Sequence, residues 1–431
     1  MIPQSDAATL EYEPGTSAYT TPIPTKRVSL WFLLLFAAAS TGAYIAVLSP
    51  AVVTLALKTR QITDTPEAAA EALGLVAGVG AFLAVVANPL FGRLSDNTTA
   101  RMGMRRPWML GGFVLGVAGL ALMGLAPDLL ALTFGWCIAQ LGFNAVLATQ
   151  VAVLYDRVPV VQRGLASGLL GLAMPIALSA GAFIVQAVAP SNFLMFVVPG
   201  LVGGVFVVAF ALILPDRHLA KADQRKLSIG FFLGSFFINP VKYPDFTWTW
   251  VSRFLFFMAY AILTTYQTFY LIDHLREDES LVPTLLFAAQ TLQSAVIIVL
   301  SLASGRLSDY LRRRKVFVIA ASLIYGIAMF VIAGASDYGP FLAGMAISGV
   351  GFGIYFAIDL ALVADVMPDG RDTAKAFGVF NVAGVLPQSV APPVAALVLA
   401  VSAGSYAALY MVAGALAVLG ALAILAVRSV K

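Results

Sequence analysis

Gly92-Arg93-Leu94-Ser95-Asp96 joins two long apolar stretches, and Gly305-Arg306-Leu307-Ser308-Asp309 repeats it 213 positions later. Cations follow both copies, from Arg101 to Arg106 in the first and from Arg312 to Lys315 in the second. One charged hairpin present in both halves of a chain is typical of transporters built from repeats. We therefore expect two homologous halves, each with this hairpin between two apolar spans.

The composition predicts a membrane protein. Hydrophobic residues make up 60% of the chain and charged residues 11%, and the mean hydropathy is +0.91, which is too apolar for a soluble domain. Twelve apolar segments approach the ~20 residues that a helix needs to cross a bilayer. They lie at about 28–57, 69–92, 108–126, 129–155, 164–189, 193–214, 246–272, 283–304, 316–335, 338–364, 375–401 and 404–427. The predicted fold is all-α, with twelve transmembrane helices in two pseudo-symmetric six-helix bundles.

Four segments make up the predicted domain organisation. Residues 1–27 are polar and lack the apolar core of a signal peptide, so we expect a disordered cytoplasmic tail. Residues 28–214 and 246–431 form the N-terminal and C-terminal bundles, and residues 215–245 form a cytoplasmic linker. Within the linker, residues 229–238 are apolar but too short to span, which fits an interfacial helix or a plain linker equally well.

The basic residues predict the orientation. Of the 26 Lys and Arg, 22 fall in cytoplasmic segments if both termini are cytoplasmic. Lys58, Arg60 and Arg276 then lie outside, Arg253 lies within span 7, and the acidic run 273–279 is a solvated external loop. This asymmetry predicts a multi-pass protein of the cell membrane with both termini inside. The net charge of +4 reflects topology and contact with anionic lipids, and requires no nucleic-acid partner.

The charges of the repeated hairpin favour a gate over a plain topology signal. Glycine lets helix ends approach closely, and an aspartate at a helix boundary can pair with a helix N-terminus or an arginine. A second repeat, Asp156-Arg157-Val158-Pro159 and Asp365-Val366-Met367-Pro368, has an offset of 209 at its prolines. These groups either latch the halves together on the cytoplasmic side or cap helix ends. The predicted gating residues are Gly92, Asp96, Arg101, Gly103, Arg105, Arg106, Asp156, Arg163, Gly305, Asp309, Arg312 and Asp365.

Spans 1, 4, 7 and 10 each carry a polar or aromatic pair four residues apart, and this spacing places both residues on one helix face. The pairs are Ser40/Tyr44, Gln140/Asn144, Tyr266/Tyr270 and Tyr355/Asp359. Spans 3 and 6 are nearly bare of such groups and should face lipid. For any single Gln or Asn, a contact between helices is the better explanation, whereas the set of four pairs favours a polar cavity. The candidate substrate-binding residues are Ser40, Tyr44, Gln140, Asn144, Tyr266, Gln267, Tyr270, Gln290, Gln293, Tyr355 and Asn381.

Asp359 is the only carboxylate well inside an apolar span, six residues before Asp365. At 1.5 Å per residue it should lie roughly 9 Å deeper in the membrane. Without a cationic partner, such a group could take up a proton on one side and release it on the other. A partner such as Lys375, or a cation from another helix, would make it a structural ion pair instead. The sequence leaves both interpretations open.

The hairpin resembles the loop between spans 2 and 3 of the major facilitator superfamily. Its longer form, Asp96-Asn97-Thr98 continuing to Arg106-Pro107-Trp108, is similar to the glycoside–pentoside–hexuronide:cation symporters and the related sucrose transporters, as is the stretch 359–388. The resemblance implies the fold of that superfamily, with spans 1, 4, 7 and 10 around a central cavity. In the melibiose-type members, carboxylates in span 2 bind the coupling cation. Span 2 here, at 73–91, has no acid, which speaks against a sodium site of that kind.

No pattern of a catalytic or metal site competes with transport. The chain lacks a P-loop, a Gly-x-Ser-x-Gly elbow and metal-ligand spacing; its single cysteine, Cys137, lies in an apolar span, and His218 and His274 lie in loops. We expect no enzyme and no cofactor beyond a proton or another coupling cation. The expected function is proton-coupled uptake of a sugar or glycoside by a monomer. The alternative is proton-driven efflux of an amphipathic compound or lipid, and the duplicated hairpins disfavour a receptor or scaffold.

Overall fold

The structure is a computed structural model that describes residues 24–219, 242–311, 313–366 and 373–428. These residues contain twelve helical segments long and apolar enough to cross a membrane, and no strand. Each coincides with one predicted span, which confirms the all-α fold with twelve membrane helices. The apolar run 229–238, predicted as an interfacial helix or linker, lies outside the described residues.

The N-terminal half contains six spans. The first consists of α1 (Leu30–Ser49), the π-helical turn η1 (Pro50–Thr54) and α2 (Leu55–Gln61). The other helices are α3 (Pro66–Asp96), α4 (Arg106–Leu125), α5 (Leu129–Arg157), α6 (Val160–Gly171), α7 (Ala173–Val188) and α8 (Asn192–Ile213). Helices α6 and α7 together form the fifth span. Side-chain oxygens of Ser29, Thr65 and Asp128 accept the backbone N–H three residues later, which fixes where α1, α3 and α5 begin.

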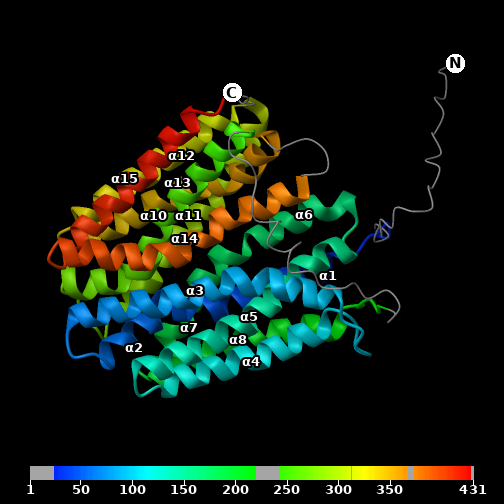
Figure 1. Ribbon diagram of the computed structural model, residues 1–431, viewed down its shortest axis with the longest axis horizontal. Coiled ribbons are helices and arrows are strands. Elements are labelled where there is room, and N and C mark those ends of the chain that lie inside the picture. The colour runs from blue at the N-terminus through cyan, green and yellow to red at the C-terminus, as the bar shows by residue number, and fades with distance from the viewer. Residues whose placement is uncertain (1–23, 220–241, 312, 367–372, 429–431) are drawn as a thin grey trace.

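The C-terminal half repeats this arrangement. Its seventh span joins α10 (Pro244–Phe269) to the π-helical turn η3 (Tyr270–His274). The remaining helices are α11 (Val282–Leu311), α12 (Arg314–Ala333), α13 (Tyr338–Val366), α14 (Thr373–Val401) and α15 (Tyr406–Leu425). Spans 1 and 7, which correspond in the two halves, thus both contain a π-helical turn near the same end of the molecule. Figure 1 shows the N-terminal half, coloured from blue to green, below the C-terminal half, coloured from green to red.

The two halves meet along matched pairs of helices. Helix α3 (span 2) packs against α14 (span 11), and α7 (span 5) packs against α11 (span 8). Exchanging the halves converts the first pair into the second, so the interface has pseudo-two-fold symmetry. The symmetry axis passes near η1 and α10 of spans 1 and 7, which also touch. This is the arrangement that the duplicated sequence predicts.

Within each half, small residues bring helices close together. Gly42 of α1 faces Gly203 of α8, and a Cβ at Gly42 would lie 2.2 Å from the Gly203 carbonyl oxygen. Such close approach is typical of helix packing inside membranes, where dispersion contacts replace the hydrophobic effect. Helix α4 packs against α5 and α8 at the far side of the half.

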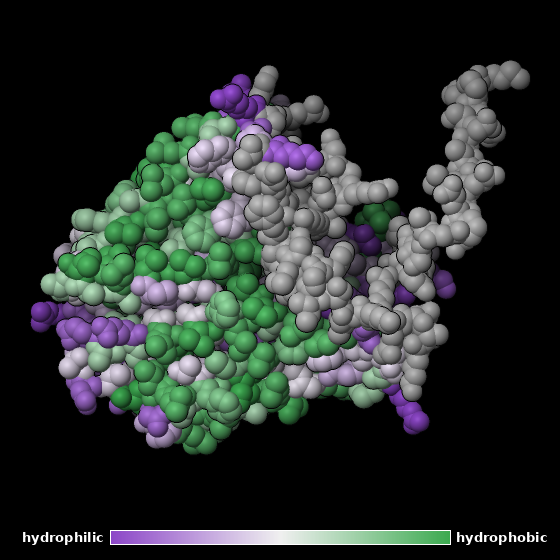
Figure 2. Space-filling view, in the orientation of Figure 1, coloured by the Kyte–Doolittle hydropathy of each residue, from purple (hydrophilic) through white to green (hydrophobic). Residues whose placement is uncertain are grey.

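The outer surface is apolar along the spans. Figure 2 shows hydrophobic residues over the middle of the molecule and hydrophilic residues gathered toward its ends. Val114 of α4 and Val205 of α8 have exposed fractions of 66% and 65%, in agreement with lipid-facing surfaces on spans 3 and 6. A continuous exposed apolar surface of this kind is expected where lipid replaces water.

Candidate functional site

The centre of the C-terminal half contains a buried ion pair. A guanidinium nitrogen of Arg253 on α10 contacts a carboxylate oxygen of Asp359 on α13, and the two side chains are 11% and 7% exposed. The Arg253 guanidinium also lies over the rings of Phe380, at 4.2 Å, and Phe257, at 5.1 Å. The pair therefore joins α10 to α13, and the Phe380 ring adds α14 to the same contact.

Arg253 of span 7 provides Asp359 with a cationic partner from another helix. The side chain of Lys375, the other cation that the sequence suggests, lies outside the described residues. Gly384 on α14 makes room for Arg253, because a Cβ there would lie 2.9 Å from a guanidinium nitrogen. Sequence reasoning noted Arg253 inside a span without giving it a role. A cation within an apolar helix was the signal that could have identified it.

Aromatic side chains surround this pair on the side of α13. Tyr355, one turn before Asp359, is 2% exposed and stacks on Phe256 at a centroid distance of 3.8 Å. Phe256 also contacts Tyr325, and Phe352 contacts Tyr260 at 4.6 Å. The predicted pair Tyr355/Asp359 therefore does occupy one helix face, but that face is packed within the C-terminal half.

The N-terminal half presents a cluster of amides on the predicted face of α5. Asn144 donates to the Gln140 carbonyl at 2.9 Å and to its side-chain oxygen at 3.1 Å, and Asn88 of α3 reaches Asn144 at 3.5 Å. Gln150, six residues further along α5, is 3% exposed, and neither side-chain amide atom has a hydrogen-bond partner among the described residues. Buried amides left without partners call for water or a ligand. Sequence reasoning overlooked Asn88 and Gln150.

A second group of amides lies between α10, α11 and α13. Gln290 donates to Gln267 at 3.1 Å, and Gln293 donates to Ser348 at 2.8 Å. All four side chains are fully buried. The side-chain oxygens of Gln290 and Gln293 have no partner among the described residues. These contacts bring three predicted residues together, although part of their bonding capacity serves to join helices.

The remaining predicted substrate-binding residues lie at different places in the fold. Tyr266 donates to the Pro392 carbonyl of α14 at 3.1 Å and lies beside Gly74 of α3, so it stands at the contact between the halves. The Tyr270 hydroxyl instead donates to the Ile332 carbonyl of α12, which places Tyr270 inside the C-terminal half. Ser40 is buried, Tyr44 is half-buried and Asn381 is exposed.

The first hairpin is organised around Arg105. Arg105 is 4% exposed and pairs with Asp96 at 2.5 Å and with Asp156 at 2.9 Å, while it also donates to the Ser95 hydroxyl. Burial lowers the pKa of Arg105, but Asp156 and Asp96 more than offset this and raise the pKa above its ordinary value. The two predicted repeats, at 92–96 and 156–159, thus meet at one cation.

Asp216, which follows α8, completes this network and was not predicted. It accepts hydrogen bonds from the backbone N–H of Arg105 at 2.7 Å and of Arg106 at 2.8 Å, where α4 begins. Gly103 has φ of +106°, and a Cβ there would lie 2.3 Å from an Asp216 carboxylate oxygen. The Arg106 side chain donates to the Leu212 carbonyl at 3.1 Å. An acid after an apolar span was the signal available in the sequence.

All of these contacts of the first hairpin stay within the N-terminal half. Arg101 is exposed, and Arg163 lies over the Tyr155 ring at 5.3 Å and donates to the Val158 carbonyl at 3.1 Å. Gly92 makes no close packing contact, because a Cβ there would meet no atom of the described residues within 4 Å. The network therefore ties the ends of α3, α4, α5 and α8 together in this structure. A latch between the halves at this end stays a prediction.

The second hairpin is described only in part. Gly305 lies next to Ala357 of α13, and Lys315 donates to the Leu425 and Val427 carbonyls, which ties the start of α12 to the end of α15. The predicted gating side chains of this copy lie outside the described residues, namely those of Asp309, Arg312 and Asp365.

The opposite end of the molecule holds the halves together through an ion pair, which we name the distal latch. Arg60 of α2 contacts Asp273 of η3 at 2.6 Å and Glu279 at 3.8 Å. The Tyr406 hydroxyl donates to Asp273 at 3.2 Å, and Thr268 donates to the Val52 carbonyl at 2.9 Å. The expectation of a merely solvated acidic loop is wrong for Asp273, because its side chain is only 15% exposed.

Comparison with known proteins identifies the fold. The family model of the Major Facilitator Superfamily matches residues 30–292 and 283–431. A crystal structure of a mutant of the nucleoside transporter NupG superposes with a TM-score of 0.72 at 14% identity, covering 92% of this chain and 99% of that one. A bacterial homologue of the human lysosomal transporter Spinster, in an inward-facing and unoccupied conformation, gives 0.71 at 12% identity, covering 93% and 97%.

One curated relative matches over a short segment. The general alpha-glucoside permease of Schizosaccharomyces pombe is 38% identical over 77 residues, which are 18% of this chain and only 14% of the length of that relative. Similarity of this extent supports the superfamily and leaves the substrate open. The family model covers both halves, and the twelve spans and their pseudo-symmetry agree with it. The chain therefore belongs to the Major Facilitator Superfamily and is a multi-pass membrane transporter.

Proposed function

We propose that this transporter is a secondary carrier that takes up a sugar or glycoside together with a proton, by alternating access between its two halves. The observation that carries the proposal is the buried Asp359–Arg253 pair. In this proposal both termini are cytoplasmic and the protein lies in the cell membrane, in keeping with the distribution of basic residues.

The buried pair supports coupling because its net charge depends on whether Asp359 is ionised or carries a proton. A proton on Asp359 would leave Arg253 without its counter-ion in a nearly dry site, which is costly unless another group or a substrate takes the place of the carboxylate. Substrate and proton would then favour the same conformation, which is what coupling requires. The pair joins α10 to α13, so its rupture also loosens two spans next to the interface between the halves.

The buried amides of both halves support a substrate rich in hydroxyl groups. Gln150, Gln290 and Gln293 contribute buried amide atoms without partners among the described residues, and Nε of Arg253 is likewise unbonded. Hydroxyl groups of a sugar can donate to and accept from such groups, and tyrosine or phenylalanine rings suit its C–H faces. The short match to an alpha-glucoside permease agrees with this substrate class.

Proton-driven efflux of an amphipathic compound or lipid is the second candidate. The observation that favours it is the aromatic cluster around Tyr355, Phe256 and Phe352, which would suit a large apolar ligand. Both candidates use the same fold and the same buried pair, so the direction and identity of the transported compound distinguish them.

Transport by the purified protein in proteoliposomes tests the proposal. We expect a labelled α-glucoside to accumulate above equilibrium when the outside is acidic, and a protonophore to abolish the accumulation. Asp359→Asn should lose gradient-driven accumulation and retain substrate exchange. Asp64→Asn, at an exposed loop position, serves as the control and should behave like the parent.

The structural interpretation of the pair predicts a different result. Asp359→Asn would then fold poorly, and a second change, Arg253→Gln, would partly restore folding because it removes the unpaired cation. Unchanged pH-driven accumulation in a well-folded Asp359→Asn protein would rule out coupling at this site. Failure of every sugar in the uptake assay, with export of a lipid dye, would favour the efflux function.

A further inference from the structure

We propose that a pocket at the basic end of the N-terminal half binds the headgroup of an anionic phospholipid. The pocket has a volume of about 650 Å³ and lies between the start of α1, the end of α5 and the segment that follows α8. Its lining combines four cations and one carboxylate with apolar side chains. The pocket is separate from the buried Asp359–Arg253 pair and from the distal latch.

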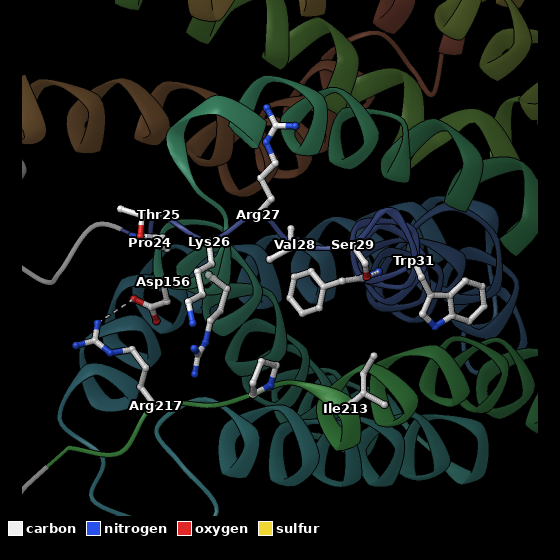
Figure 3. Close-up of a pocket in the computed structure, with 13 residues that line it drawn as sticks. Pro24, Thr25, Lys26, Arg27, Val28, Ser29, Trp31, Asp156, Ile213 and Arg217 are labelled. Carbon is white, nitrogen blue, oxygen red and sulfur yellow. Dashed lines mark hydrogen bonds and ion pairs between the residues drawn. The ribbon is translucent and has the colours of Figure 1, made fainter.

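The charge of the lining is strongly unbalanced. Lys26, Arg27, Arg157 and Arg217 contribute four positive charges to the lining against the single negative charge of Asp156. Three of the four remain when Arg27, whose side chain points away in Figure 3, is left out. That carboxylate already pairs with the buried Arg105 at 2.9 Å, and Arg217 reaches it only at 3.9 Å. The pocket therefore holds excess positive charge even after its own acid is counted.

Two of the lining cations lack a direct partner. Among the described residues, no hydrogen bond or ion pair engages the side chains of Lys26 or Arg157, and Arg157 is attracted at longer range by Asp216 and Asp156 and repelled by Arg217. Figure 3 shows Lys26 on the side of Asp156 and Arg217, while Arg27 points the other way. Converging like charges are stabilised by an anion placed between them, and a phosphodiester group offers the oxygen acceptors that they need.

The position of the pocket favours a lipid over a soluble anion. Trp31, in the first turn of α1, is 69% exposed, and Ile213, at the end of α8, is 49% exposed. Both line the pocket on the side that leads onto the spans, away from the labelled cations in Figure 3. An exposed tryptophan at a span end is typical of the membrane interface. A phosphate held by Lys26 and Arg157 would therefore have its acyl chains directed along the apolar surface of α1 and α8.

Native mass spectrometry of the full-length protein in detergent tests the site. The probes are a phosphatidylglycerol, a phosphatidylcholine with the same chains, and glycerol 3-phosphate as the headgroup without chains. We expect retained phosphatidylglycerol, and binding weaker by on the order of 25-fold in Lys26→Gln/Arg157→Gln, because each of the two cations near an anionic surface contributes a factor of about five. Phosphatidylcholine should bind weakly to both proteins.

A matched control removes a cation elsewhere at the same end. Arg306 is exposed at the corresponding end of α11, and Arg306→Gln should leave phosphatidylglycerol binding unchanged. If the double variant is poorly folded, Lys26→Gln alone is used, since Lys26 is exposed, and about fivefold weaker binding is expected. Equal binding of phosphatidylglycerol to parent and variant would overturn the proposal. Displacement of the lipid by millimolar glycerol 3-phosphate would assign the pocket to a soluble phosphate instead.

Discussion

At the scale of single residues, Arg105 and Arg253 illustrate two uses of a buried cation. Arg105 is held by two carboxylates and a hydroxyl at the end of the spans, where its net effect is to fix four helix ends. Arg253 has one carboxylate and two aromatic rings inside the spans. Arg105 is fully neutralised by its carboxylates, whereas Nε of Arg253 has no hydrogen-bond partner among the described residues. Arg253 is therefore the better candidate for a group that changes state during transport.

Gly103 provides a test of backbone geometry. Its φ of +106° and the nearby Asp216 carboxylate leave no room for a side chain. We expect Gly103→Ala to destabilise the protein by about 1–3 kcal/mol, because it adds backbone strain and displaces the acid that caps α4. Thermal unfolding in detergent measures this. Gly111→Ala is the control, because a Cβ at this position would meet no atom of the described residues within 4 Å. That change should therefore be neutral or slightly stabilising.

Asp96 tests the gating hypothesis. Its carboxylate is 62% exposed while Arg105 beside it is buried, so the Asp96→Asn change removes part of the charge that compensates Arg105. We expect slower turnover with little change in substrate affinity, because neither Asp96 nor Arg105 is among the candidate substrate-binding residues. Initial rates at several substrate concentrations separate the two effects. Normal rates in both Asp96→Asn and Asp309→Asn would contradict a gating role for the hairpins.

At the scale of elements, the distal latch shows how spans 1 and 7 hold the halves together. Their π-helical turns, η1 and η3, lie at the same end, and a hydrogen bond from Thr268 to the Val52 carbonyl crosses between the halves there. Arg60 and Asp273 add charge to that contact. In alternating access this end must open, so its contacts have to be strong enough to close it and weak enough to break.

Removal of the distal latch should shift the balance between conformations. Arg60→Gln leaves Asp273 without its cation, and we expect the state closed at this end to lose about 1 kcal/mol, as for other partly exposed ion pairs. Spin labels on α2 and α11 would report a larger population of long distances. Arg276→Gln, at an exposed position three residues after Asp273, provides the control. Identical distance distributions in the parent and Arg60→Gln would show that the ion pair does not hold the halves together.

At the scale of the whole molecule, the pseudo-two-fold axis determines which helices can slide. Helices α7 and α11 meet across it, and the Ser179 and Thr291 hydroxyls lie 2.7 Å apart, while the tilted rings of Phe183 and Phe287 are in contact at a centroid distance of 5.4 Å. The equivalent contact of α3 with α14 lies on the other side of the axis. Rocking of one half against the other must change at least one of these two interfaces.

A cysteine pair at Ser179 and Thr291 tests this interface directly. In a background without Cys137, we expect Ser179→Cys/Thr291→Cys to form a disulfide readily, because the hydroxyl oxygens already lie near disulfide range. Cross-linking should abolish transport, and a reductant should restore it. The single variants control for loss of the hydroxyls. Full transport by the cross-linked protein would mean that this interface does not move.

The sequence by itself determined the number of spans, the duplication and the lipid-facing surfaces, because these depend on local hydropathy and on a repeat visible along the chain. It also identified Asp359 and brought the hairpin aspartates and arginines to attention, because a charge at a span end or within a span is conspicuous in an apolar sequence. The packing of α3 on α14 came from the structure, and the symmetry between the halves relates it to the packing of α7 on α11.

Only the tertiary structure decided which charges pair with which. Asp359 meets Arg253, Arg105 joins the nearby Asp96 to Asp156, and Arg60 reaches Asp273. Apart from the Arg105–Asp96 contact, these pairs join segments far apart in the chain. Such contacts depend on the rotation of each helix about its axis and on its depth relative to its neighbours, and neither quantity is encoded in local periodicity. The same holds for Tyr270: its spacing from Tyr266 placed both on one face, but the π-helical turn that starts at Tyr270 and the packing of α12 gave its hydroxyl to a backbone carbonyl of α12.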